Sequence, residues 1–128
     1  MSLSSNYVEA VKSHASCLNS LADAIHDFNR GVGWYDNPRE DGTLQMLIVT
    51  EVAEMCEASR KNGAQPDHHI PEFPNEGVEC ADAIIRLLDY AAYKGFPIGQ
   101  ILAAKFAYNT IRVDHKKEAR AAEGGKKY

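Results

Sequence analysis

The sequence predicts an all-α protein in which four helices form a bundle-like protomer, with the active site between helices. Four segments carry apolar residues at spacings of three and four, which is the period of a helix. Glycine and proline residues separate these segments, and no run alternates apolar and polar residues as a half-buried strand does. A chain of 128 residues suits one domain, which we place at residues 1–120, with a flexible tail at 121–128.

Turn-forming residues set the bounds of the four predicted helices. The first covers residues 6–29 and ends before two glycines. The second covers residues 43–62 and is followed by Gly63, which suits a left-handed cap. The third, 74–94, and the fourth, 97–117, each begin with a proline, a residue well suited to the first turn of a helix.

Composition and charge exclude several classes of protein. The formal net charge is -4, whereas a protein that binds a nucleic-acid polymer usually carries a basic surplus, so we expect no such partner. No segment has the apolar length of a membrane span or of a signal peptide, which predicts a cytoplasmic protein without a membrane partner. The three cysteines lack CxxC spacing and are expected to be reduced and mostly packed.

The second predicted helix places a carboxylate at the centre of its apolar stripe. On a helical wheel, five apolar side chains lie within about 60° of Glu51, namely Leu44, Leu47, Ile48, Met55 and Ala58. Because a carboxylate is rarely buried unless it is paired or binds a metal, a cationic group should meet Glu51. Glu54 lies one turn on and converges on the same point. The cation is either a metal ion or an Arg or Lys of another helix.

The third predicted helix carries Glu79 and Asp82, again three residues apart. The wheel places both acids opposite an apolar side formed by Val78, Ala81, Ile84, Ile85, Leu88 and Ala92. Taken alone, the acids belong to a solvated face that also includes Arg86 and Asp89, with an Asp82–Arg86 pair. That interpretation changes only if another helix or a second subunit covers this face.

On the fourth predicted helix, an apolar stripe continues in register as Lys105, Asn109 and Arg112. These side chains are suited to contact successive phosphates, Lys as a point charge and Arg as a two-pronged donor. The alternative is a solvated helix end whose cations favour the helix dipole. Two acid pairs and a basic stripe fit a hard cation facing a polyphosphate, and a set of oxygen ligands without Glu-x-x-His favours Mg²⁺ or Mn²⁺ over iron.

The two acid motifs have a familiar spacing. Glu51-Val-Ala-Glu54 and Glu79-Cys-Ala-Asp82, with LQMLIVTEVAEMCEASRK, EGVECADAIIRLLDYAAYKG and KFAYNTIRVDHKK around them, resemble the ExxE…ExxD signature of the MazG-type and dCTPase-like nucleoside triphosphate pyrophosphohydrolases. The resemblance covers residues 34–117. It implies Mg²⁺, with Mn²⁺ as a substitute, held by the four acids, and cleavage of a (deoxy)nucleoside triphosphate to the monophosphate and pyrophosphate. It also implies control or cleansing of the nucleotide pool by a homodimer or homotetramer.

The resemblance suggests roles for further residues. Glu54 is the hypothetical base that orients the attacking water, with Glu51 as its catalytic neighbour, while Lys105, Asn109 and Arg112 resemble the phosphate-contacting pattern of the family. His115 fits that pattern less well, because Lys116 replaces a common glycine. Trp34 is expected to stack on the nucleobase, with Asn37 or Asn29 reading its edge; alternatively, Trp34 closes the end of the bundle as an apolar plug.

Three other functions are consistent with parts of the sequence. A phosphoribosyl-ATP pyrophosphohydrolase is the closest alternative enzyme. The pair His26-Asp27, with His14, suggests a metal phosphohydrolase of the HD type on the basis of two adjacent residues. A non-catalytic helical oligomerisation module is the alternative from another class, and its acids would form salt bridges at an interface.

Overall fold

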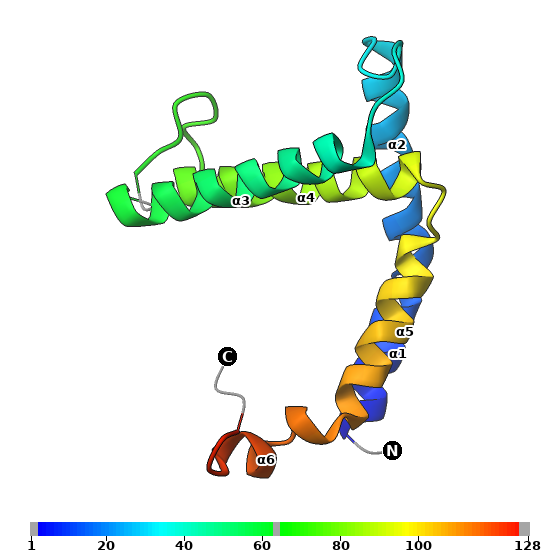
Figure 1. Cartoon of the computed structure of the whole chain (residues 1–128), viewed down its shortest axis with the longest axis vertical. Coiled ribbons are helices and arrows are strands. Elements are labelled where there is room, and N and C mark those ends of the chain that lie inside the picture. The colour runs from blue at the N-terminus through cyan, green and yellow to red at the C-terminus, as the bar shows by residue number, and fades with distance from the viewer. Residues whose placement is uncertain (1–2, 63–64, 126–128) are drawn as a thin grey trace. The chain divides into compact units, whose positions relative to one another are not determined.

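The computed structural model describes residues 3–62 and 65–125, and its elements over these ranges are helices (Figure 1). They are α1 (Leu3–Ser13), α2 (Ala15–Gly31), α3 (Asp41–Asn62), α4 (Asn75–Tyr93), α5 (Ile98–Ile111), the 3-10 helix η1 (Val113–His115) and α6 (Lys117–Ala121). No β-strand occurs within the described ranges, which confirms the all-α class. No helix in this part of the chain combines the length and the apolar character needed to cross a membrane.

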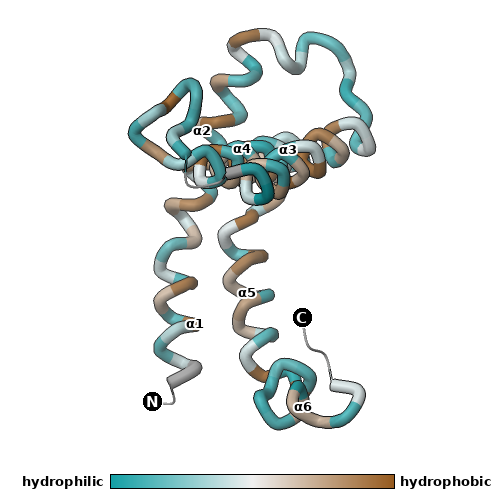
Figure 2. The backbone as a smooth tube through the Cα atoms, turned by 90° about the vertical axis from the view of Figure 1, so that its left-hand side faces the viewer, coloured by the Kyte–Doolittle hydropathy of each residue, from teal (hydrophilic) through white to brown (hydrophobic). Residues whose placement is uncertain are grey.

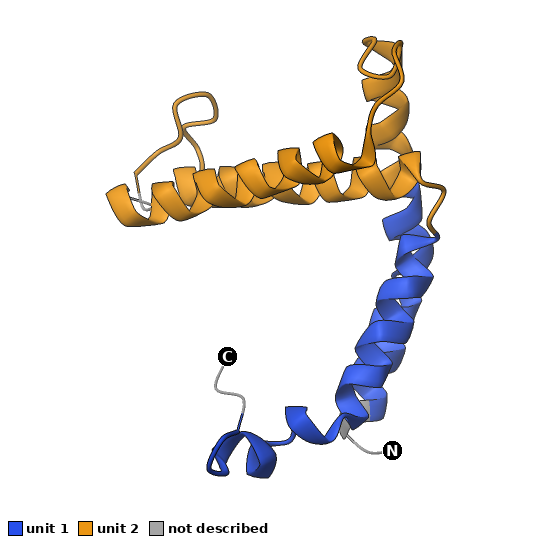
Figure 3. Cartoon of the chain, viewed as in Figure 1, with its two compact units in different colours: residues 1–20, 97–128 blue, residues 21–96 orange. Residues whose placement is uncertain are grey.

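The chain divides into two compact units (Figure 3). One consists of Met1–Ser20 and Pro97–Tyr128, and the other is Leu21–Phe96. The expectations of a single domain at 1–120 and of a bundle-like protomer stay predictions. Gly63 and residues 126–128 of the expected tail lie outside the described residues, whereas residue 121 is the last of α6.

Helices α3 and α4 form an antiparallel pair in the Leu21–Phe96 unit (Figure 1). Three side-chain hydrogen bonds join them in reversed order: Asp41 with Lys94, Gln45 with Tyr90, and Glu51 with Arg86. Leu44 and Ala58 are buried on α3, as the predicted apolar stripe requires. The turn signals also placed α4 correctly, because Pro74 is its N-cap residue and Lys94 its C-cap residue.

The predicted orientation of α4 is correct at Leu88, which is buried, but wrong for several other residues. Ile84 and Ile85, assigned to the buried side, are 50% and 41% exposed, whereas Asp89, which was expected on the polar face, is only 4% exposed. Arg86 hydrogen-bonds to α3 from the side that was expected to be solvated. A helical wheel predicts that the most apolar side of a helix is buried. In this protein, hydrogen bonds to polar side chains of α3 determine which side of α4 faces α3.

Helices α1 and α5 pack together in the other unit (Figure 2), and the first turns of α2 approach the start of α5 closely. The backbone N–H of Gly99 donates to Oδ1 of Asn19 at 2.7 Å, which satisfies a donor in the first turn of α5. A Cβ atom added to Gly99 would lie 2.0 Å from the carbonyl oxygen of Ala15. Only glycine fits this close approach.

The first predicted helix is interrupted at His14, so the expectation of one helix over residues 6–29 is wrong. The Ser13 hydroxyl donates to the carbonyl oxygen of Ala10 at 2.8 Å, and Nδ1 of His14 lies 2.8 Å from the same oxygen. Short polar side chains that bond to the preceding turn compete with the helical backbone pattern. Two such neighbours explain why α1 ends there and α2 begins at Ala15.

The fourth predicted helix ends earlier than its sequence suggested. Helix α5 stops at Ile111, and Arg112 has extended backbone angles of φ -64° and ψ 132°. The expectation of a continuous helix to residue 117 is therefore wrong. The cysteines are free, as expected, but the expectation of packed thiols is wrong because Cys17, Cys56 and Cys80 are all exposed.

Candidate metal centre

Carboxylates from α3 and α4 gather at one place along the helix pair. One carboxylate oxygen from each of Glu51, Glu79 and Asp82 lies within 4.8 Å of the other two. These three residues belong to the two acid motifs, and the antiparallel pairing of their helices brings the motifs together. As the wheel suggested, neither acid of α4 is buried, but α3 packs beside them and brings them close to Glu51.

Glu54, the fourth acid of the motifs, lies beside this group without joining it. Its side chain is exposed, and its negative charge contributes to a raised pKa of Glu79. Both acids line a cavity of about 370 Å³, together with Asn75 and residues of the loop that follows α3. Glu54 is therefore a solvent-exposed acid at the edge of the acid group.

The acid group carries negative charge that the protein compensates only in part. Burial raises the pKa of Glu79, and the carboxylates of Glu54 and Asp82 raise it further. Burial also raises the pKa of Asp82, as does the charge of Glu51, while Arg86 acts in the opposite direction. Because each acid disfavours the charged form of its neighbour, a bound cation would favour ionisation of the whole group.

Arg86 supplies one positive charge to this group. Its Nε donates to Oε1 of Glu51 at 3.0 Å, which confirms the expectation that a cationic group meets Glu51 and, in particular, the Arg or Lys alternative. The expected pair between Arg86 and Asp82 is not among the ion pairs of the described residues. Arg86 thus connects the two helices at the acid group rather than pairing along α4.

The ring of Trp34 lies against the guanidinium group of Arg86. The guanidinium carbon of Arg86 is 4.6 Å from the centroid of the Trp34 ring, and that of Arg39 is 5.9 Å away. Arg39 also donates to the carbonyl oxygen of Trp34 at 3.3 Å. Trp34 as a residue is 39% exposed, so part of it remains accessible to solvent. Asn37 is exposed in the same loop, and its role in base recognition stays a prediction.

A buried polar network one turn further along α4 was missed from the sequence. Asp89 accepts hydrogen bonds from the Tyr35 hydroxyl at 2.8 Å and from Nδ1 of His26 at 2.7 Å. Tyr35 also stacks on Tyr93, with ring centroids 4.9 Å apart. His26 therefore pairs with Asp89, and the adjacent Asp27 faces Arg30, while the HD interpretation of His26 and Asp27 stays a prediction. No periodic signal in the sequence marks this network.

The expected phosphate-binding residues lie in the other unit. Lys105 and Asn109 are on α5, and Lys105 Nζ lies 5.0 Å from the Tyr108 ring centroid. Arg112 is the C-cap residue of α5 and pairs with Asp114, so it does not continue the helical stripe. Oδ1 of Asn109 is buried and has no hydrogen-bond partner within the described part of the chain. A contact of these residues with phosphates stays a prediction.

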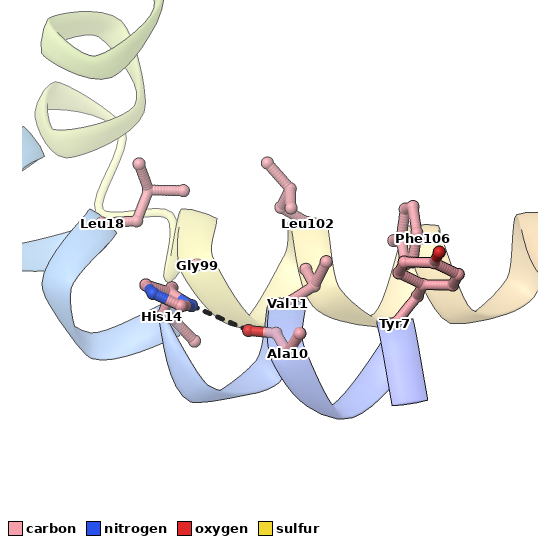
Figure 4. A pocket seen from close by; sticks show the side chains of 9 residues that line it. Tyr7, Ala10, Val11, His14, Leu18, Gly99, Leu102 and Phe106 are labelled. Atoms are coloured by element: carbon pink, nitrogen blue, oxygen red, sulfur yellow. Dashed lines mark hydrogen bonds between the residues drawn. The ribbon is translucent and has the colours of Figure 1, made fainter. Parts of the chain in front are cut away.

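An apolar cavity of about 380 Å³ lies between α5 and the helices α1 and α2 (Figure 4). Val11, Leu18, Leu102 and Phe106 line it, and the polar side chains at its wall are Tyr7 and His14. Among the described residues, no Lys, Arg, Asp or Glu is part of this lining. The cavity therefore lacks the charged groups that a polyphosphate or a metal ion requires.

Comparison of the chain with protein-family models, with curated proteins and with solved structures finds no match. The functional argument therefore depends on the residues themselves. Two acid motifs that resemble a known signature lie on adjacent antiparallel helices, and three of their four carboxylates share one place.

Proposed function

We propose that the protein is a Mg²⁺-dependent nucleoside triphosphate pyrophosphohydrolase that cleaves a (deoxy)nucleoside triphosphate to the monophosphate and pyrophosphate. The observation that carries this proposal is the set of carboxylate oxygens of Glu51, Glu79 and Asp82 within 4.8 Å of one another. A set of carboxylates without sulfur or imidazole suits a hard cation, Mg²⁺ or Mn²⁺. The ExxE…ExxD resemblance supplies the reaction.

These three acids and Glu54 would hold the cation. Such an ion neutralises phosphate charge and lowers the pKa of a coordinated water. Glu54 is exposed at the cavity that it shares with Glu79, and its carboxylate would accept a proton from the attacking water. Glu51 orients the site from a buried position, where Arg86 fixes one of its oxygens.

The remaining parts of the proposal concern recognition and assembly. Trp34 offers an accessible ring close to the acids for stacking of a nucleobase, and Asn37 lies in the same loop. Lys105, Asn109 and Arg112 would contact the phosphates. Ile84, Ile85 and Leu87 expose between 41% and 51% of their surface on α4, which supports self-association. We propose a homodimer or homotetramer and a cytoplasmic location.

Pyrophosphate release tests the proposal. The purified protein is incubated with Mg²⁺ and a panel of canonical and modified nucleoside triphosphates. Glu54→Gln should keep its helical content and its bound metal while turnover falls by about 10²- to 10⁴-fold, the usual effect of losing a general base. Glu76→Gln, which alters an exposed acid in the first turn of α4, is the matched control and should retain full turnover.

Two results would contradict the proposal, the first its reaction and the second its assignment of the base. One is the absence of pyrophosphate from every nucleotide when the folded protein has Mg²⁺ in excess. The other is equal turnover by the wild type and Glu54→Gln, which would remove Glu54 from the role of base.

One observation favours a second candidate function, a non-catalytic helical oligomerisation module. Arg86 already serves as the counter-ion of Glu51, so the burial of this acid is explained without a metal ion. The exposed apolar residues of α4 would then be the functional surface. An assembly state that is the same with and without Mg²⁺, in a protein that binds no Mn²⁺, would favour the module over the enzyme.

A further inference from the structure

A buried aspartate organises the loop between α3 and α4. Asp67 is 6% exposed, and its Oδ1 accepts hydrogen bonds from the backbone N–H groups of His69 and Ile70, both at 2.8 Å. The two backbone bonds and the side chain of Asn75 keep the pKa of Asp67 below its ordinary value. Asp67 is therefore an ionised, fixed hydrogen-bond acceptor at the base of the loop.

The backbone of this loop closes onto the start of α4. The N–H of Asp67 donates to the carbonyl oxygen of Phe73 at 2.9 Å, and the N–H of Asn75 donates to the carbonyl oxygen of Gln65 at 2.8 Å. Asn75 is the first residue of α4. Hydrogen bonds from the loop thus hold both the backbone and the side chain of Asn75.

The side chain of Asn75 connects this loop to the acid group. Its Nδ2 lies 3.1 Å from Oδ2 of Asp67 and 3.1 Å from Oε1 of Glu79. Ionised carboxylates accept hydrogen bonds and donate none, so the amide must present its nitrogen to both. One N–H goes to each acid, which fixes the rotation of the amide. Asn75 and Glu79 are four residues apart, the spacing of neighbours on one helix face.

An amide orients Glu79 without cancelling its charge. Glu51 is held by the positive charge of Arg86, whereas the contact that holds Glu79 is neutral. Glu79 Oε1 is engaged by the amide, and Oε2 forms no hydrogen bond with the described residues. Glu79 therefore offers a fixed carboxylate that is not paired with a cationic side chain among the described residues, which suits a ligand of a cation site.

We infer that Asn75 is a positioning residue for Glu79, and that Asp67 anchors Asn75. This inference rests on the metal centre proposed above, and it identifies the loop after α3 as its support. Residues behind the ligands of a metal site orient them, and their loss typically lowers metal affinity about 10- to 100-fold. The chain from Asp67 through Asn75 to Glu79 has this arrangement.

Mn²⁺ binding tests the inference without reference to turnover. Electron paramagnetic resonance of free Mn²⁺ gives the dissociation constant for the wild type, Asn75→Ala, Asp67→Asn and the double variant, and circular dichroism checks that each is folded. Asn75→Ala should weaken Mn²⁺ binding about 10- to 100-fold. Asp67→Asn alone should weaken Mn²⁺ binding. When Asn75→Ala is already present, adding Asp67→Asn should weaken Mn²⁺ binding no further, because Asp67 acts through Asn75. Glu72→Gln, an exposed acid of the same loop, is the control and should bind as the wild type does.

The possible failures are distinguishable. A folded wild type that binds no Mn²⁺ overturns the metal centre itself. Wild-type Mn²⁺ binding that Asn75→Ala leaves unchanged overturns the role of Asn75 alone, and independent losses in the double variant overturn the connection through Asp67. If Asn75→Ala does not fold, Asp67→Asn decides, since it keeps the shape of the side chain: unchanged Mn²⁺ affinity in this variant overturns the inference.

Discussion

Glu51 of α3 and Arg86 of α4 form an ion pair whose side chains are only 12% and 25% exposed. The same guanidinium group lies against the ring of Trp34, with 4.6 Å between its carbon and the ring centroid. One arginine therefore contacts both a candidate metal ligand and the candidate base-stacking residue. A substitution of Glu51, Arg86 or Trp34 should therefore alter the environment of the other two side chains.

Replacing Arg86 tests the cost of leaving Glu51 without a partner. Breaking a fully buried pair costs about 3–5 kcal/mol, and the partial exposure of Arg86 reduces this, so Arg86→Met should lower the free energy of unfolding by about 2 kcal/mol. Urea denaturation measures the loss. In Arg86→Met with Glu51→Gln, the destabilisation should be less than the sum of the two single effects; strict additivity would show that the pair contributes nothing.

Trp34 is the single tryptophan of the chain, so its fluorescence reports on this place alone. If a nucleobase stacks on the ring, a saturating nucleotide with Mg²⁺ should quench the emission. Stacking of a base on an aromatic side chain contributes about 1–3 kcal/mol, so Trp34→Ala should raise the dissociation constant of the nucleotide roughly 5- to 150-fold. Isothermal titration calorimetry checks the variant, and an unaltered emission spectrum at saturation would argue against stacking.

Gly99 is predicted to tolerate no side chain. A Cβ atom at this position would lie 2.0 Å from the Ala15 carbonyl oxygen, so Gly99→Ala must push α5 away from the backbone of residue 15. Overpacking of this kind costs about 1–3 kcal/mol or more, which thermal and urea denaturation would detect. Gly42→Ala is the control, because nothing lies within 4 Å of its added methyl group; it should be neutral or stabilising. Equal effects of the two substitutions would contradict the close approach.

Asp67 makes stability depend on pH in a defined direction. Hydrogen bonds from the backbone N–H groups of Ile70 and His69 lower its pKa below the ordinary value of 3.8. The folded state therefore binds this proton less readily than the unfolded state, so the stabilisation is complete above pH 3.8 and is lost as the pH falls through the folded-state pKa. Urea denaturation between pH 3 and pH 7 should show a decline in the wild type that is smaller in Asp67→Asn. Parallel curves would contradict the prediction.

Helix boundaries and the face of α3 could be predicted because local chemistry decides them. The glycines and prolines between α3, α4 and α5 act within a few residues, and the wheel placed Glu51 among Leu44 and Ala58 because α3 has one apolar side. The break at His14 was missed because two polar side chains that bond to Ala10 look ordinary on a helical wheel. The end of α5 before Arg112 was missed as well, because the helical spacing of side chains in the sequence does not change there.

The face of α4 could not be predicted because it depends on partners distant in the sequence. Arg86 and Tyr90 bind side chains of α3, and Asp89 is buried by His26 and Tyr35. Apolar periodicity carries no information about such pairs. The acids of the candidate site were nevertheless found from the sequence, since their motifs identify them without knowledge of the face.

The nested contacts of the α3–α4 pair imply an order of events during folding. The innermost contacts belong to the loop, where Asp67 bonds to Phe73, and the outer ones join Glu51 to Arg86 and then Asp41 to Lys94. Closing a short segment costs less chain entropy than closing a long one, so association should begin at the loop and proceed toward the far ends of the two helices. Destabilising changes in the loop should then slow folding, whereas changes at the Asp41–Lys94 end should mainly accelerate unfolding. The loop that supports Glu79 would thus also be the folding nucleus from which the association of α3 and α4 proceeds.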